Sequence, residues 1–394
     1  MIKDWSTFNG LNITINTTED CNLRCKYCYE IYKKPGNINL ETAKKFLDWI
    51  FDDPDPTGIA GEREDYNDGL VLDLIGGDAL MNVDILDDIF KYVQYKWIMG
   101  DKFRLRGWRA SISSNGTLFA NPKVREFCEK WKNHISLGVS IDGCPEIHDK
   151  NRIFCDGRGS MKTIMEWWPW YKKNFPINGR ETKATCNKDS IPYLYESLKF
   201  MHEELGLRWI HQNFIAEDIG ITREDLKLLD NQLALCCDYC IEHKDDLYWS
   251  MFGPNFQFPT NERITSTESW YKASCGAGQM PACSIKGEIW PCFRWLPQSQ
   301  GDKTKNYCIG SLDKGINKEI FKSVRKQSTK ENCTKDPKCR DCEYESACVW
   351  CVAGCFAEYS DFIRTTHLCE ITKLQCKWAQ KYLEKLRELE NENC

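Results

Sequence analysis

The chain has 394 residues, enough for one large domain with a smaller one, or for two to three domains. Its net charge of −5 excludes the basic surface that nucleic-acid-binding domains present. No stretch approaches the ~20 consecutive apolar residues of a membrane-spanning helix, and the N-terminus lacks the apolar run of a signal peptide. We therefore expect a cytoplasmic protein with no nucleic-acid or membrane partner.

Short apolar runs alternate with helical stretches through the first 225 residues. This alternation predicts βαβ units and a parallel sheet, hence an α/β fold. Six strands before residue 225 are too few for a closed eight-stranded barrel. The expected strands are 11–15, 71–75, 109–113, 135–141, 182–187 and 209–214. The expected helices are 40–51, 83–97, 122–132 and 193–205, with an amphipathic helix at 222–245.

A cysteine-rich loop, residues 19–30, follows the first predicted strand and reads E-D-C-N-L-R-C-K-Y-C-Y-E. Its cysteines Cys21, Cys25 and Cys28 have the spacing C-x3-C-x2-C. Thiolates in such runs hold iron–sulfur clusters, and three of them leave one iron of a [4Fe–4S] cube open to a chelating molecule. The position after a strand is where (β/α) barrels carry reactive groups. A zinc knuckle or a loop of reduced thiols is the alternative interpretation.

Small and polar residues also follow the next predicted strands. Gly76-Gly77-Asp78 ends the second strand, and its two glycines allow a ligand to approach the backbone closely. Ser113 and Asn115 end the third strand. Ser140 and Asp142 end the fourth strand, and Arg152 follows them. These residues are candidate ligand-binding groups around the cysteine loop.

Cysteines are unusually frequent, with 23 in the chain. Because thiols stay reduced in the cytosol, clustered cysteines there indicate metal or cluster ligands and not disulfides. Seven scattered cysteines in the middle of the chain are expected to be packing residues. Thirteen more occur from Cys275 onward, in a long ordered run. A zinc ribbon could explain single C-x2-C pairs, but not so many ligands at once.

The cysteine loop resembles the motif of radical S-adenosylmethionine (SAM) enzymes, including the aromatic Tyr27 beside the last cysteine. This resemblance implies a partial (β/α)6 barrel and a [4Fe–4S] cluster that binds SAM. Gly76-Gly77-Asp78 resembles the family's Gly-Gly-Glu motif, with aspartate in place of glutamate. The resemblance implies that SAM contacts Gly76, Gly77, Asp78, Ser113, Asn115, Ser140, Asp142 and Arg152.

The C-terminal cysteines resemble the SPASM domain, which carries two auxiliary [4Fe–4S] clusters. By this resemblance, Cys339, Cys342, Cys348 and Cys369 would hold the distal cluster. Cys275, Cys283 and Cys292 would hold the proximal one, with either Cys351 or Cys355 as fourth ligand. The expected domains are a radical SAM barrel at 1–225, a linker at 226–270 and a SPASM domain at 271–394.

Enzymes with these two domains mostly modify peptides or proteins. The resemblance therefore implies a maturase that cleaves SAM reductively and installs a thioether or carbon–carbon crosslink in a ribosomally made peptide. Its expected partners are a peptide, with or without a leader sequence, and an electron donor such as flavodoxin or ferredoxin. Formylglycine formation in sulfatases is less favoured, because Phe293 stands where sulfatase maturases carry a catalytic aspartate.

Two further alternatives remain, dehydrogenation of a small metabolite and a non-catalytic iron–sulfur electron carrier. The candidate SAM-binding residues at the strand ends favour an enzyme over a carrier. The sequence indicates no general base.

Overall fold

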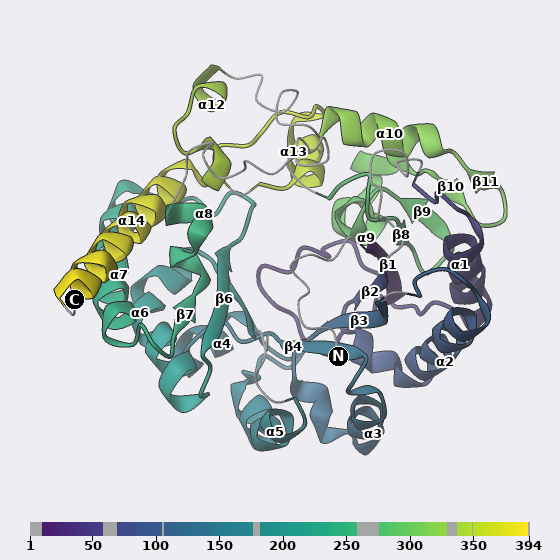
Figure 1. Ribbon diagram of the computed structural model, residues 1–394, viewed down its shortest axis with the longest axis horizontal. Helices are drawn as coiled ribbons and strands as arrows, with labels where there is room; N and C mark the ends of the chain where they lie inside the picture. Colours follow the sequence, from purple (N-terminus) through teal and green to yellow (C-terminus); the bar gives the residue numbers. More distant parts are fainter. Residues whose placement is uncertain are drawn as a thin grey trace.

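The computed structural model describes residues 10–57, 69–104, 106–175, 182–257, 276–328, 337–348 and 350–392. In this part of the chain, eleven strands form one sheet, in the order β11-β10-β9-β8-β1-β2-β3-β4-β5-β6-β7 (Figure 1). The first six strands are β1 (Leu11–Thr18), β2 (Gly69–Gly76), β3 (Gly107–Ser114), β4 (Ile135–Val139), β5 (Thr182–Cys186) and β6 (Trp209–Phe214). All six expected strands are present and pair in parallel, which confirms the predicted α/β partial barrel.

Helices between the strands cover the outer face of the barrel (Figure 1). They are α1 (Leu40–Asp52), α2 (Val83–Met99), α3 (Pro122–Trp131), α4 (Pro145–Asn151), α5 (Met161–Asn174), α6 (Leu194–Lys199) and α7 (Arg223–Glu242). In α1, Ala43, Phe46, Leu47 and Ile50 recur at helical spacing and are fully buried in the barrel core. The helix begins where the Asn39 side chain accepts a hydrogen bond from the Thr42 amide at 2.8 Å.

Short strands extend the sheet beyond both ends of the expected barrel. At one end, β7 (Tyr248–Trp249) pairs in parallel with β6. At the other end, β8 (Ala282–Cys283) pairs in parallel with β1. The strands β9 (Glu288–Trp290), β10 (Gly310–Ser311) and β11 (Gly315–Ile316) continue from β8 as an antiparallel meander. The cysteine-rich region is therefore joined to the barrel through β1, next to the cysteine loop.

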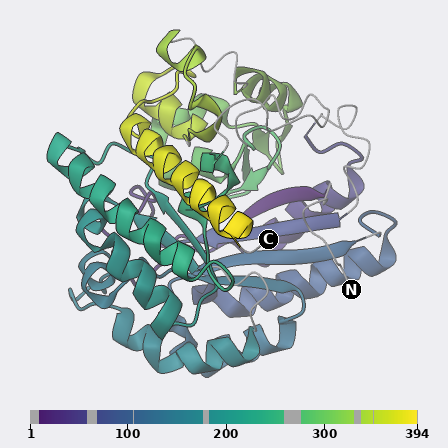
Figure 2. The ribbon, with the colours of Figure 1, turned by 60° about the vertical axis from the view of Figure 1, so that its left-hand side comes forward.

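The C-terminal helix α14 (Cys369–Glu392) lies along α7, so the end of the chain returns to the barrel (Figures 1 and 2). Lys377 Nζ and Trp378 Nε1 both contact the Asp230 carboxylate of α7 at 2.6 Å. The proposed boundary between linker and SPASM domain, at residue 270, falls outside the described residues. Among the helices that the structure describes, none combines the length and apolarity needed to cross a bilayer.

Candidate active site

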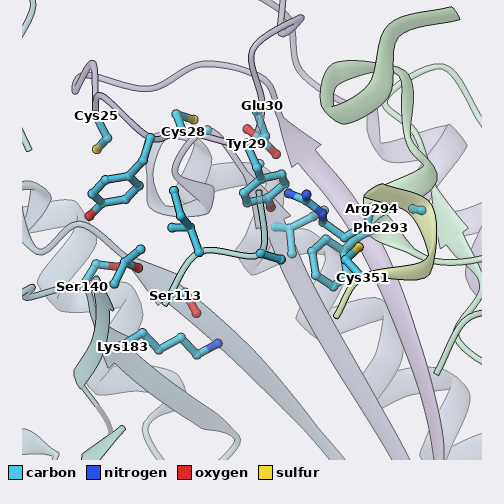
Figure 3. A pocket seen from close by; sticks show the side chains of 18 of the residues that line it. Cys25, Cys28, Tyr29, Glu30, Ser113, Ser140, Lys183, Phe293, Arg294 and Cys351 are labelled. Atoms are coloured by element: carbon cyan, nitrogen blue, oxygen red, sulfur yellow. The ribbon is translucent and has the colours of Figure 1, made fainter. Parts of the chain in front are cut away.

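A cavity of about 600 Å³ lies between the cysteine loop, the ends of the barrel strands and the cysteine-rich region (Figure 3). Ten sequence-predicted site residues line it: Cys21, Cys25, Cys28, Gly76, Gly77, Ser113, Asn115, Ser140, Arg152 and Cys292. Cys351, one of the two alternatives for the fourth proximal ligand, lines it as well. Asp78 and Asp142 are buried and do not line the cavity. One cavity therefore reaches from the N-terminal cysteines to the C-terminal ones.

The three thiols of the cysteine loop each have a nitrogen donor nearby. Asn115 Nδ2 lies 3.9 Å from Cys21 Sγ, Arg152 Nη1 lies 4.0 Å from Cys25 Sγ, and Lys33 Nζ lies 3.5 Å from Cys28 Sγ. Such donors stabilise thiolates that bind a metal cluster and tune its potential.

Burial, reinforced by Asp78, raises the pKa of Cys21 to about 11, and burial also raises the pKa of Cys25. Both thiols are therefore protonated at neutral pH until a cluster displaces their protons. Three half-buried thiols with donors at one cavity edge fit the ligand set of a [4Fe–4S] cluster with one open iron.

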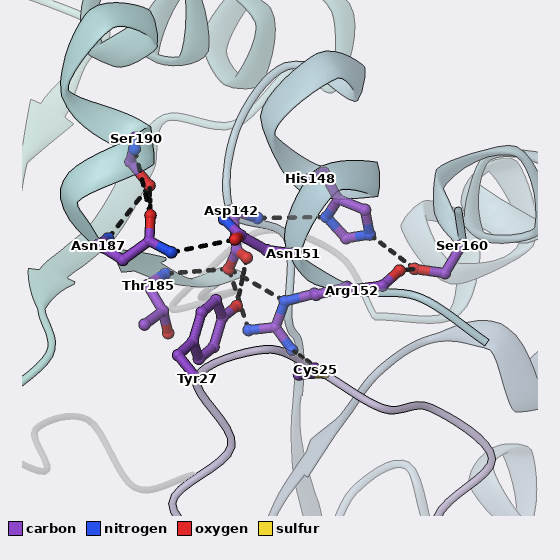
Figure 4. Close-up of polar contacts among 10 residues, drawn as sticks. All are labelled: Cys25, Tyr27, Asp142, His148, Asn151, Arg152, Ser160, Thr185, Asn187 and Ser190. Carbon is purple, nitrogen blue, oxygen red and sulfur yellow. Dashed lines mark hydrogen bonds and ion pairs between the residues drawn. The ribbon is translucent and has the colours of Figure 1, made fainter. Parts of the chain in front are cut away.

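A buried ion pair holds the cysteine loop against the barrel (Figure 4). Arg152 Nε and Nη2 each lie 3.0 Å from Asp142 Oδ1, and the Tyr27 hydroxyl donates to the other carboxylate oxygen. Asp142 is fully buried and also accepts a hydrogen bond from the Thr185 amide at 3.1 Å. Asp142 is thus saturated by protein groups, whereas Arg152 also faces the cavity. The network fixes Tyr27 and, through it, the segment between Cys25 and Cys28.

His148 supports this network from behind. Its Nδ1 accepts from the Asp142 amide at 3.3 Å, and its Nε2 contacts Ser160 Oγ at 2.9 Å, which in turn donates to the Arg152 carbonyl (Figure 4). Burial, together with the nearby Arg152 charge, lowers the pKa of His148 to about 3. The imidazole is therefore neutral, with its proton on Nε2, and orients the segment that carries Arg152.

The Gly76-Gly77-Asp78 segment packs directly against the start of the cysteine loop. The amide of Gly77 donates to Thr18 O at 3.1 Å, and that of Asp78 donates to Asp20 O at 2.9 Å. A Cβ on Gly77 would lie 2.3 Å from Asp20 O and 2.7 Å from Cys21 Cβ. Both amides therefore already donate to the cysteine loop. The carbonyl oxygens of this segment could accept hydrogen bonds from an amino group in the cavity.

The Asp78 carboxylate points away from the cavity into the protein. One oxygen accepts from the Leu80 amide at 3.1 Å, and the other accepts from Ser114 Oγ at 3.0 Å and the Asn115 amide at 2.8 Å. Burial raises the pKa of Asp78 to about 6. The side chain thus ties the ends of β2 and β3 together, and the shorter aspartate suits this role.

Gly77→Ala tests the close approach of the two segments. We expect the overlap with Asp20 and Cys21 to destabilise the fold by about 1–3 kcal/mol and to displace Cys21. Iron bound per chain after anaerobic reconstitution should fall relative to wild type. Gly157→Ala controls for backbone strain without a clash, because a Cβ there has no atom within 4 Å but its φ of +86° disfavours a side chain. Its iron content should match wild type. Equal iron content in wild type and Gly77→Ala would contradict this account of the motif.

Four C-terminal cysteines, Cys339, Cys342, Cys348 and Cys369, lie close enough for their charges to interact. Burial raises the pKa of Cys348 to about 11, and the nearby Arg364 opposes this shift. Arg364 is buried, pairs with Glu345 at 2.8 Å and lies over the Trp350 ring at 4.6 Å. The structure therefore places the four predicted distal ligands near one another, with the Arg364 charge close to Cys348.

The predicted proximal set is only partly assembled. Cys275 lies outside the described residues. Cys283 is buried in the barrel core with Ile15 and Ile289, whereas its neighbour Ala282 packs in the apolar cluster that contacts Cys292 and Cys351. Since successive strand residues point to opposite faces, Cys283 is turned away from Cys292.

The two alternatives for the fourth proximal ligand differ in exposure. Cys351 faces the cavity and contacts Arg294, whereas Cys355 is buried and accepts a hydrogen bond from the Thr365 amide at 3.5 Å. Of the two, Cys351 is placed to meet a group bound in the cavity.

Several cavity residues were missed from the sequence. Tyr29, half-buried, has Phe293 edge-on at 6.0 Å and the Arg294 guanidinium over its ring at 4.6 Å. Arg294 pairs with Glu217. Asp73 and Lys183 line the cavity from β2 and β5. The alternation of side chains along each strand was the available signal, because it places both residues on the barrel's inner face.

Comparisons with known proteins agree with this geometry. The model of the radical SAM superfamily matches residues 15–182. A cysteine-type anaerobic sulfatase-maturating enzyme of Clostridium novyi is 22% identical over 366 residues, which is 84% of this chain and 84% of that protein. A protein of Methanocaldococcus jannaschii is 26% identical over 190 residues, covering 48% of this chain and 58% of the relative.

Two solved structures share the fold over most of the chain. The structure titled native anSMEcpe with bound AdoMet and Cp18Cys peptide has a TM-score of 0.72 at 15% identity, covering 98% of this chain and 100% of that one. Streptococcus suis SuiB bound to precursor peptide SuiA has a TM-score of 0.58 at 14% identity, covering 91% and 75%.

The match to the radical SAM superfamily covers the partial barrel and its cysteine loop, and it supports the predicted enzyme. The chain carries the radical SAM domain in residues 15–182, and its cysteine-rich C-terminal region is consistent with a SPASM-type maturase.

Proposed function

We propose that this enzyme abstracts a hydrogen atom from a peptide or protein substrate and installs a thioether or carbon–carbon crosslink. The observation that carries the proposal is the single cavity lined by Cys21, Cys25 and Cys28 at one end and by Cys292 and Cys351 at the other. A substrate in this cavity would lie between the radical source and a second redox centre. Two structures that share the fold contain a bound peptide, Cp18Cys in one and the precursor SuiA in the other, and this supports a peptide substrate.

The residues at the first end of the cavity suit a SAM-binding cluster. Cys21, Cys25 and Cys28 would hold the cluster, which with bound SAM supplies a 5′-deoxyadenosyl radical. The carbonyls of Gly76 and Gly77 could accept from the SAM amino group. Ser113, Ser140 and Arg152, all on the cavity wall, offer donors for the ribose and the carboxylate.

At the other end, we propose two auxiliary clusters. Cys339, Cys342, Cys348 and Cys369 would hold the distal one. Cys275, Cys292 and Cys351 would contribute to the proximal one, with Cys351 preferred over Cys355 because it faces the cavity. These centres would remove an electron from the substrate after hydrogen abstraction, and flavodoxin or ferredoxin would supply the electron that initiates the reaction.

Formylglycine formation is the second candidate, favoured by the match to a sulfatase-maturating enzyme over 84% of both chains. Against it stands Phe293, which lines the cavity directly after Cys292 and brings an apolar ring where the resemblance implies an aspartate. The carboxylates that do line the cavity come from other segments, at Glu30, Asp73 and Glu217.

Anaerobic incubation with SAM, dithionite and a pool of synthetic cysteine-bearing peptides deuterated at carbon tests the proposal. We expect deuterium in 5′-deoxyadenosine and a peptide that has lost a pair of hydrogens. A thioether would consume its thiol, whereas a carbon–carbon crosslink would leave the thiol free. An aldehyde that reacts with a hydrazide would instead indicate formylglycine. Deuterium transfer from free amino acids but from no peptide would contradict a peptide substrate.

A further inference from the structure

A layer of polar side chains crosses the inside of the barrel below the cysteine loop. Thr14, Asp73, Ser111 and Ser136 are direct neighbours in the register of β1 to β4. Lys183 lies on β5 one residue after Thr182, which pairs with Val139, so it is nearer the C-terminal ends of the strands than Ser136. Their strand neighbours, among them Leu72, Leu74 and Ile112, pack in the core beneath the helices. Barrel interiors are usually filled by branched apolar residues, so a polar layer here needs another explanation.

Asp73 is the central acid of this layer. Its carboxylate accepts a hydrogen bond from Ser111, and Lys183 is the positive charge that acts on it, while burial raises the pKa of Asp73. Both Asp73 and Lys183 line the cavity, and Lys183 extends along the cavity wall below Ser113 (Figure 3). Although both residues are described by the structure, they form no ion pair with each other. A polar group of a substrate could therefore bind between them.

Unmet hydrogen bonds occur next to this pair. Thr14 Oγ1 and both polar side-chain atoms of Asn16 are buried on β1, on the face that carries Asp73 on β2, and no partner of theirs is among the described residues. Unpaired buried polar groups are costly, and ordered water or a ligand usually supplies the missing hydrogen bonds. Arg294 also lines the cavity, beside Cys351, but its guanidinium is already paired with Glu217.

We propose that Asp73 and Lys183 hold the substrate residue that is oxidised, with Asp73 accepting its proton and Lys183 binding a carbonyl or anionic group. This inference rests on the proposed function. Forming a thioether from a C–H and an S–H breaks both bonds and makes one C–S bond. The hydrogen atom goes to the deoxyadenosyl radical, the proton to Asp73 and one electron to an iron–sulfur cluster of the cysteine-rich region. The atoms and charge then balance, and formylglycine chemistry would use the same proton acceptor.

Asp73→Asn tests the proton acceptor, because the amide keeps the shape but is a poor base. With the deuterated peptide pool we expect 5′-deoxyadenosine to form, while product per 5′-deoxyadenosine falls about 100-fold. Asp156→Asn, at an exposed site, is the control and should match wild type. An unchanged ratio in Asp73→Asn would overturn the proposal, as would loss of 5′-deoxyadenosine with SAM binding intact, which would place Asp73 before hydrogen abstraction.

Lys183→Met gives a readout that does not depend on turnover. Fluorescence anisotropy of the labelled peptide pool on reconstituted protein should show about tenfold weaker binding, because a charge-assisted hydrogen bond is lost. Unchanged binding would overturn the role of Lys183. If wild-type protein modifies no peptide of the pool, the proposed function itself fails. If wild type modifies a peptide but the Asp73 and Lys183 variants behave like wild type, only this inference fails.

Discussion

Arg152→Met is expected to destabilise the protein by about 3–5 kcal/mol, because it leaves the Asp142 charge buried without its cation. Asp142 is fully buried, and Arg152 provides both of its ionic contacts, at 3.0 Å. Tyr27 donates a hydrogen bond to Asp142, and Asp142 would no longer be held by Arg152. The segment that carries Cys25 and Cys28 should therefore become less ordered. Denaturant unfolding of the variant measures the first effect, and iron content after reconstitution measures the second.

The matched control is Arg158→Met. Arg158 pairs with Asp156 at 2.8 Å, but both side chains are more than half exposed, so the change should cost at most about 1 kcal/mol. Arg152→Met combined with Asp142→Leu should recover part of the lost stability, since no buried charge then remains. Equal stability losses in Arg152→Met and Arg158→Met would contradict a buried ion pair behind the cysteine loop.

Replacing Cys21, Cys25 and Cys28 together by alanine is expected to abolish formation of 5′-deoxyadenosine from SAM and dithionite. Without these thiolates the cluster that would bind SAM has no ligands, so the C–S bond of SAM should stay intact. Because the three side chains lie at the edge of the cavity and not in the hydrophobic core, the fold should survive. Chromatographic quantification of 5′-deoxyadenosine under anaerobic conditions measures the effect.

Cys155→Ala controls for the loss of a nearby thiol. Cys155 is exposed and contacts the Asn22 carbonyl at 3.7 Å, within the cysteine loop, yet it lies outside the cavity. Its replacement should leave 5′-deoxyadenosine formation at the wild-type level. Persistent cleavage in the triple variant would place the radical source elsewhere in the chain.

The barrel could be predicted because its strands have five to eight residues each and alternate with helices of clear periodicity. The strands β7 to β11 could not, since each has only two or three residues and carries too little pattern. Four of them, β8 to β11, nevertheless join the cysteine-rich region to β1. Short strands of this kind are fixed by tertiary pairing and not by local sequence.

Cysteine spacing predicts which cysteines belong to each cluster, but not the direction in which each side chain points. Cys283 has a suitable position in the sequence, yet strand alternation turns it into the barrel core. Asp78 and Asp142 follow strands as binding residues do, yet hydrogen bonds from Ser114, Asn115 and Thr185 occupy their carboxylates. Conversely, Asp73 is a single acid within an apolar strand, and its place in the cavity appears only once the register of β1 to β5 is known.

The most direct test of the central claim is iron and sulfide content after anaerobic reconstitution, with a visible spectrum, for wild type and for the variant lacking Cys21, Cys25 and Cys28. We predict about twelve irons per chain in wild type and about eight in the variant, because one of three four-iron clusters is lost. About four irons in wild type, all lost in the variant, would contradict the two auxiliary clusters and remove the proposed electron acceptor from the cysteine-rich region.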